Sequence, residues 1–160
     1  KTRVKSKGIQ IVWEADRAEE GIHAQAIHLH PKDFGAILSL DSMDPPSQWL
    51  WAGLNWQEKT NTELCDFLNG VHMPSKDPET MMKKWEGALG KKSTYKDNKF
   101  VIELNESRIV FNEASNIKGE GIEAFEMKVK NKENILKDAE ELNLIREGSI
   151  NIGGVKFLLN

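Results

Sequence analysis

Residues 70–104 of the chain read GVHMPSKDPETMMKKWEGALGKKSTYKDNKFVIEL, and residues 124–158 repeat their pattern as AFEMKVKNKENILKDAEELNLIREGSINIGGVKFL. At an offset of 54 residues, Met73 aligns with Met127, and the polar and apolar positions that follow match over the helix-forming part. A repeat in this size range is typical of a supersecondary unit that cannot bury its apolar face alone. The sequence therefore predicts two similar units that share one core.

Each copy reads as a strand, a helix cap, a helix and a strand. In the first copy, Asp77 is a good N-cap, Pro78 suits the first helical position and Gly90 suits the end of the helix. In the second copy the cap is Asn131. The apolar positions of both helices fall on one face at helical spacing: Met81, Met82, Trp85, Ala88 and Leu89 in the first, and Ile135, Leu136, Ala139 and Leu142 in the second.

The strands after the helices match less well. The same offset pairs FVIEL (100–104) with GVKFL (154–158), and the first copy continues with a further strand over 107–113. We therefore expect two similar but unequal copies. Residues 118–121, Lys-Gly-Glu-Gly, join them and are expected to form a flexible link.

The first third of the chain has a different character. Residues 8–42 read as three strands, the third from Phe34 to Leu40. The basic stretch 1–7 reads as a solvated tail or the end of a trimmed helix. Residues 41–62 contain a Pro-Pro pair and three tryptophans, which predicts a long connection packed onto the domain by its aromatic side chains. The alternative for the tryptophans is a ligand-stacking wall or a subunit interface.

The composition excludes several classes of protein. The chain has 160 residues, a formal net charge of −3 and one cysteine, Cys65. These values argue against a dedicated nucleic-acid binder, a disulfide framework and a cysteine-rich zinc module. No apolar run approaches the roughly 18 residues that span a bilayer. We expect a cytoplasmic globular protein without a membrane or nucleic-acid partner, and a packing role for Cys65.

A strand-helix-strand-strand-strand unit (βαβββ) present twice resembles the plan of the vicinal oxygen chelate, or glyoxalase/bleomycin-resistance, superfamily. Residues 63–160 look like two such units. Residues 26–41, AIHLHPKDFGAILSLD, are similar to the last two strands of methylmalonyl-CoA epimerases, in which a Leu-His-Pro-Lys-Asp turn precedes a glycine. The resemblance implies that the parent architecture has four units, of which this chain holds two and a half.

The resemblance thus implies an α+β fold of paired βαβββ modules with extra leading strands from a truncated module. The expected divisions are a partial leading unit over 1–43, a linker rich in Pro and Trp over 44–62, and a two-module domain over 63–160, with modules 63–117 and 121–160. Leading strands without a partner unit would leave open sheet edges. We therefore expect a homodimer, or packing of these strands on the second copy.

Family enzymes hold a divalent metal in a cup, with histidine or glutamine on first strands and glutamate on last strands, so a divalent metal is implied here too. The family's ligand positions fall on residues that cannot bind a metal or lie near such residues: Leu40, Gly70, Val110 and Ala124. The nearby candidates are His72 and Glu113 as catalytic residues, and His72, Glu113 and Glu123 as metal ligands. Glu126 is a further candidate on the opposite strand face from Glu123. The alternative for each is a structural or surface role.

Candidate ligand-binding residues are Trp85, His28 and His30. His28 and His30 share a face at strand spacing, as a metal pair would, but His30 also suits a turn before Pro31. Trp85 belongs to the predicted helix face and could instead pack the core. Lysines crowd the first repeated helix and its exit, where they could bind an anionic group or simply form a solvated face: Lys83, Lys84, Lys91, Lys92, Lys96 and Lys99.

Two functions from different classes follow. The first is a metal-assisted lyase, isomerase or epimerase acting on a small carboxylate or acyl thioester, as the resemblance implies. The second is a non-catalytic small-ligand-binding member of the fold that holds no metal. Convergent His and Glu side chains in one concavity would favour the enzyme, and a cup lined by Leu, Met and Trp would favour binding only.

Overall fold

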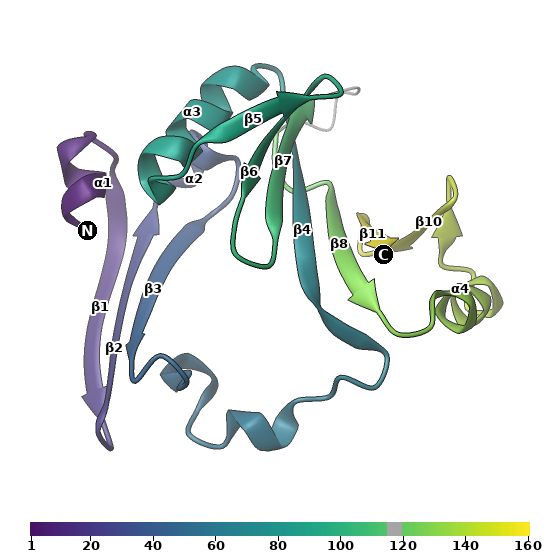
Figure 1. Cartoon of the computed structure of the whole chain (residues 1–160), viewed down its shortest axis with the longest axis horizontal. Coiled ribbons are helices and arrows are strands. Elements are labelled where there is room, and N and C mark those ends of the chain that lie inside the picture. The colour runs from purple at the N-terminus through teal and green to yellow at the C-terminus, as the bar shows by residue number, and fades with distance from the viewer. Residues whose placement is uncertain (115–119) are drawn as a thin grey trace. The chain divides into compact units, whose positions relative to one another are not determined.

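The computed structural model describes residues 1–114 and 120–160 (Figure 1). Two compact units are present: residues 1–60 with 87–90, and residues 61–86 with 91–160. Within the described residues, the longest helix has 12 residues, and no helix has the length and apolarity needed to cross a membrane. The predicted flexible link over 118–121 lies partly outside the described residues.

The first unit contains an antiparallel three-stranded sheet in the order β1-β2-β3. Its elements are α1 (Thr2–Ser6), β1 (Ile11–Glu19), β2 (Ile22–Leu29), α2 (Pro31–Phe34), β3 (Leu38–Asp44) and the 3₁₀ turns η1 (Leu50–Ala52) and η2 (Trp56–Lys59). The three strands predicted over 8–42 are confirmed. Of the two alternatives for the basic N-terminal stretch, the structure has the helix.

One predicted boundary in this unit is wrong. The third strand was expected from Phe34, but Phe34 is fully buried at the end of α2, and the strand begins at Leu38. The cause is a local turn: the backbone N–H of Lys32 donates to the His30 side chain, and Gly35 ends the helix with φ of 69°. A glycine tolerates this left-handed conformation without strain.

The connection after β3 packs on the first sheet, as the sequence predicts. Leu50 is buried with Ile22 and Ala24, and Trp51 packs against the same cluster. The indole N–H of Trp51 also donates to Asp41 at 3.0 Å. Trp51 and Leu50 therefore anchor the connection, whereas Trp49 is exposed.

The second unit is built on one eight-stranded sheet in the order β5-β6-β7-β4-β8-β11-β10-β9. Its elements are β4 (Cys65–Ser75), α3 (Pro78–Leu89), β5 (Ser93–Lys96), β6 (Lys99–Glu103), β7 (Arg108–Glu113), β8 (Ala124–Val129), α4 (Lys132–Glu141), β9 (Ile145–Arg146), β10 (Ser149–Ile152) and β11 (Val155–Leu159). Read outward from the central β4–β8 pair, both halves have the same strand order. This confirms the paired βαβββ architecture, with a first module from β4 to β7 and a second module from β8 to β11.

The predicted match between the later strands is wrong. The segment 154–158 lies mostly in β11, which pairs in parallel with β8 as β7 pairs with β4. The counterpart of β11 is therefore β7, not the segment 100–104 in β6. Each copy has one helix and four strands, and the second reaches its last strand about six residues sooner because its helix and its hairpins are shorter.

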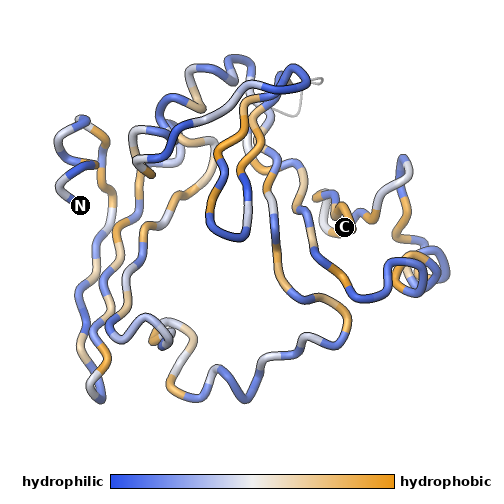
Figure 2. Tube along the Cα trace, viewed as in Figure 1, coloured by the Kyte–Doolittle hydropathy of each residue, from blue (hydrophilic) through white to orange (hydrophobic). Residues whose placement is uncertain are grey.

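The core between α3 and the eight-stranded sheet shows which face of the sheet α3 leaves open. Trp85 of α3 packs edge-on against Phe111 of β7, with ring centroids 5.8 Å apart, and both side chains are buried. Met73 pairs with Phe111 across the β4–β7 ladder and is also fully buried. Figure 2 shows hydrophobic residues concentrated in β6 and β7 and a hydrophilic turn between them. Since successive side chains alternate between faces, His72 and Val110 point away from α3.

Candidate functional site

The repeat itself brings two polar side chains together on this open face. Across the antiparallel β4–β8 ladder, Val71 is opposite Phe125, and the two residues are 54 positions apart, the offset of the repeat. The approximate two-fold axis between the modules therefore passes between them. His72 and Glu126 each come one residue after that pair. They are diagonal neighbours on the same face, a distance that long side chains span.

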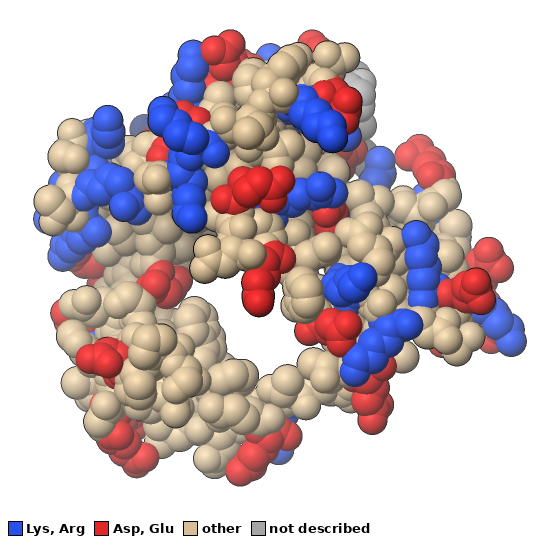
Figure 3. Space-filling view, in the orientation of Figure 1, with Lys and Arg blue, Asp and Glu red and all other residues tan. Residues whose placement is uncertain are grey.

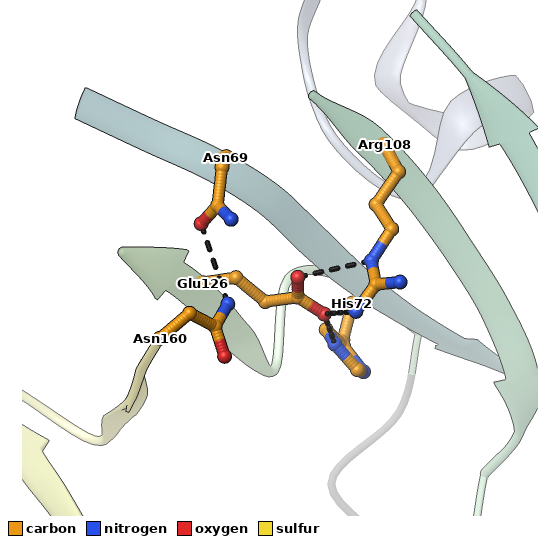
Figure 4. Close-up of polar contacts among 5 residues, drawn as sticks. All are labelled: Asn69, His72, Arg108, Glu126 and Asn160. Carbon is orange, nitrogen blue, oxygen red and sulfur yellow. Dashed lines mark hydrogen bonds and ion pairs between the residues drawn. The ribbon is translucent and has the colours of Figure 1, made fainter. Parts of the chain in front are cut away.

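A third side chain reaches the same point from the neighbouring strand. In the parallel β4–β7 ladder, Arg108 is level with Gly70, and Gly70 is opposite Glu126 on β8. His72, Arg108 and Glu126 therefore come from three adjacent strands, and their side chains meet at the Glu126 carboxylate (Figure 4).

The Glu126 carboxylate is the centre of this group. Its Oε1 lies 2.6 Å from Nε2 of His72 and accepts a hydrogen bond from Nη2 of Arg108 at 2.9 Å. Its Oε2 accepts from Nε of Arg108 at 3.0 Å, so the guanidinium binds both oxygens. Glu126 is 3% exposed, and a carboxylate so buried requires charged or hydrogen-bonding partners. The three residues form one compensated cluster.

Gly70 leaves room for the carboxylate. A β-carbon at this position would lie 2.7 Å from both Cδ and Oε2 of Glu126, closer than such contacts occur. The absence of a side chain at residue 70 is therefore a condition for the Glu126–Arg108 pairing.

The cluster also keeps the Glu126 carboxylate ionised. Burial would raise the pKa of Glu126, but the hydrogen bonds from Arg108 and His72 outweigh it and hold that pKa below its usual value. The same pairing raises the pKa of Arg108. An ionised carboxylate can only accept hydrogen bonds, so Nε2 of His72 carries the shared hydrogen. The other ring nitrogen, Nδ1, has no hydrogen-bond partner among the described residues.

The cluster forms part of the wall of a hollow of about 310 Å³ over the first module. Its lining residues are His72, Thr94, Lys96, Asp97, Lys99, Val101, Glu103, Arg108, Val110 and Glu126. Three cationic and three anionic side chains balance in this lining when His72 is neutral. Figure 3 likewise shows basic and acidic side chains intermixed on the visible face of the molecule. The crowd of lysines expected near the first helix contributes only Lys96 and Lys99 to this hollow.

The structure does not bring Glu113 or Glu123 to His72. Glu113 is level with Ser75 at the end of β7, three positions beyond the residue paired with His72, so it lies on the other face. Glu123 precedes β8, and its Oε1 lies 3.2 Å from Nζ of Lys156. Among the described residues, no three His, Cys, Asp or Glu side chains are grouped so as to hold a metal ion.

The other predicted site residues lie elsewhere. Trp85 is 6% exposed in the helix–sheet core, on the face opposite the hollow. In the first unit, His28 packs against Trp13 with ring centroids 4.4 Å apart. His30 lies beyond β2 and caps α2, which matches its predicted turn role. Cys65 begins β4 and packs with the core of the second module, as predicted.

Comparison with known proteins supports the fold alone. No protein-family model and no curated protein matches the chain. A hypothetical protein from Staphylococcus aureus aligns with 99% of this chain and 59% of its own, at 10% identity and a TM-score of 0.63. A Mn(II)-bound glyoxalase from Novosphingobium aromaticivorans aligns with 99% of this chain and 56% of its own, at 12% identity and a TM-score of 0.62.

A methylmalonyl-CoA epimerase from Mycobacterium tuberculosis aligns with 62% of this chain and 90% of its own, at 13% identity, but its TM-score of 0.47 is too low to support an inference. The chain thus spans less than three fifths of the length of the two higher-scoring structures. Together with the strand order, the similarity to the Mn(II)-bound glyoxalase shows that the chain has the glyoxalase fold.

The residues present do not fit a divalent metal. Catalytic metal sites in proteins commonly use three protein ligands, and the hollow offers only His72 and Glu126 in contact. Both oxygens of Glu126 are bound by the Arg108 guanidinium, whose charge would repel a metal ion. Gly70 cannot supply a third donor.

Arg108 is not among the site residues predicted from the sequence. The family's last-strand position falls near Val110, and the candidates around it were restricted to residue types that bind metals. The available signal was the strand alternation, because Arg108 is two residues before Val110 and shares its face. An arginine beside a glutamate position would have indicated a paired carboxylate rather than a free ligand.

Replacing Gly70 tests the packing of the carboxylate. We expect Gly70→Ala to lower the free energy of unfolding by about 1–3 kcal/mol, because the new β-carbon overlaps Glu126. Urea unfolding measures this. In a Glu126→Ala background the overlap is gone, so Gly70→Ala should be close to neutral there. An equal cost in both backgrounds would contradict the assignment.

The lowered pKa of Glu126 predicts a pH dependence. The pKa of Glu126 in the folded protein lies below its unfolded value of about 4.3. The contribution of Glu126 to the free energy of unfolding is therefore complete above the unfolded pKa and is lost as the pH falls through the folded pKa. The difference in unfolding free energy between the wild type and Glu126→Gln should therefore shrink between pH 6 and pH 3. A difference that stays constant over this range in urea unfolding would contradict an ionised Glu126.

Proposed function

We propose that this protein binds a small monocarboxylate in the hollow over the first module, without a metal and without catalysing a reaction on it. The observation that supports this most is the state of Arg108. Its Nε and Nη2 hold Glu126, its side chain is 47% exposed, and Nη1 has no hydrogen-bond partner among the described residues. The free edge of the guanidinium thus offers N–H groups to a second carboxylate.

The surrounding residues favour a small ligand with one negative charge. Lys96 and Lys99 add positive charge to the lining, while Asp97 and Glu103 oppose further negative charge. Asp97 and Glu103 would repel the second charge of a dianion. Val101 and Val110 are level with each other on β6 and β7. Val110 is buried, and the half-buried Val101 provides an apolar surface for a short hydrocarbon part.

A metal-assisted isomerase or epimerase acting on a small carboxylate or acyl thioester is the second candidate. Two observations favour it: the similarity of fold to a Mn(II)-bound glyoxalase, and the contact between His72 and Glu126. It requires Glu126 to exchange the Arg108 guanidinium for a metal ion. The paired state of Glu126 is therefore the reason for preferring metal-free binding.

The homodimer and the cytoplasmic location expected from the sequence stay predictions. The divisions at residues 43/44 and 62/63 stay proposals as well. They are independent of the ligand site, because every residue of the hollow belongs to the second unit.

Ligand binding can be tested with propionate and its neutral analogue propionamide. In buffer containing EDTA, we expect propionate to shift the amide NMR signals of residues on β6 and β7 in a saturable manner, and propionamide to have little effect. Arg108→Gln should weaken propionate binding at least about tenfold, since it removes the charged donor.

Arg146→Gln is the matched control, because Arg146 is an exposed arginine at the far edge of the same sheet. It should leave propionate binding unchanged. Equal responses to propionate and propionamide, or equal propionate affinity in the wild type and Arg108→Gln, would contradict the proposed function.

A further inference from the structure

The open face of the sheet places a guanidinium where the carboxylate of Glu126 and the imidazole of His72 meet. We propose that Arg108 is a built-in substitute for a divalent cation: it supplies the positive charge that Glu126 requires and thereby excludes metal ions from the site. The inference deepens the proposed function, because the same guanidinium would contact the ligand carboxylate.

The hydrogen bonds of Glu126 leave a metal no free position between the donors. Oε1 is shared by His72 and Arg108, and Oε2 is held by Nε of Arg108. Metal–oxygen bonds to carboxylates are about 2.0–2.2 Å long. An ion at either oxygen would therefore lie close to a guanidinium nitrogen, and the repulsion between the two cations is strong in so poorly solvated a place.

The hydrogen on His72 also opposes metal binding. The ionised Glu126 fixes that hydrogen on Nε2, which faces the carboxylate. A metal bound between the two residues would need the lone pair of the same nitrogen. Because a guanidinium keeps Glu126 ionised at neutral pH, it also maintains the tautomer of His72 that cannot bind such an ion.

Gly70 completes the exclusion. The space for a side chain at residue 70 is filled by the Glu126 carboxylate, 2.7 Å from the position of a β-carbon. The strand residue nearest to the carboxylate therefore provides no third ligand. The charge of Arg108, the hydrogen on Nε2 of His72 and the filled space at Gly70 thus all support Arg108 as the substitute for the cation.

Removing the guanidinium should therefore unmask a weak metal site. We would measure Mn²⁺ binding to the full chain by the EPR signal of free Mn²⁺ at pH 7.5, for the wild type, Arg108→Gln and Arg108→Lys. We expect Arg108→Gln to bind Mn²⁺ at least about tenfold more tightly than the wild type. Arg108→Lys keeps the positive charge and should stay like the wild type.

Two further variants locate the effect. The double variant Arg108→Gln with Glu126→Gln should lose the gain, since the carboxylate is then absent, and Arg146→Gln should show no gain. Wild-type protein that binds one Mn²⁺ per chain tightly would overturn the proposal, and this measurement needs no variant to fold. Equal Mn²⁺ affinity of the wild type and a folded Arg108→Gln would overturn it as well.

The Mn²⁺ measurement and the propionate titration can fail independently of each other. Propionate binding by the wild type without a Mn²⁺ gain in Arg108→Gln would keep the ligand site and overturn the cation substitution. A Mn²⁺ gain without propionate binding would keep the substitution and overturn the proposed function.

Discussion

The buried carboxylate of Glu126 is the constraint on which the site depends. A glutamate at 3% exposure in the middle of a sheet is unfavourable unless its charge is compensated. Glu126 is on β8, and Arg108 on β7 compensates its charge. His72 on β4, the strand between these two, completes the hydrogen bonding of the carboxylate. The glycine at position 70 is a condition for placing that charge there, and the hydrogen on Nε2 of His72 is a consequence of it.

The internal repeat explains why these residues meet. An antiparallel pairing of two equivalent strands places equivalent residues of the modules on one face as neighbours across the axis. His72 and Glu126 are such equivalents, so a repeated unit with different residues at one position produces a polar pair at the centre of the sheet. Arg108 then joins by the parallel register of β7, whereas its counterpart on β11, Lys156, contacts Glu123 instead.

Much of the fold could be predicted from the sequence, because it depends on local signals. Asn131 caps α4 as its sequence context predicts, and Ile135, Leu136 and Ala139 pack in the core as expected. The prediction for Leu142 is wrong, because it follows the end of α4 and is exposed. The later strands of the second copy could not be aligned by a fixed offset, because a shorter helix and shorter hairpins change the spacing while the strand order is kept. Pairing in space, rather than sequence spacing, shows that β11 is the equivalent of β7.

The site was less predictable, because it depends on register between strands far apart in the sequence. His72 and Glu126 could be named as candidates from residue type and strand alternation. Their contact, and the part of Arg108, required the β4–β8 and β4–β7 registers together. Glu113 shows the converse: it has the right residue type on the right strand, but a shift of three positions places it on the other face.

Arg108 and His72 together hold an ionised Glu126. The ¹⁵N chemical shifts of the His72 ring, recorded at a pH at which they show one hydrogen on the ring, test this arrangement directly, because they identify the nitrogen that carries the hydrogen. An ionised Glu126 in contact with His72 predicts the Nε2–H tautomer, with Nδ1 as the unprotonated nitrogen. A predominant Nδ1–H tautomer would mean that Glu126 donates a hydrogen to His72 or does not contact it, and would contradict an ionised Glu126 held by His72.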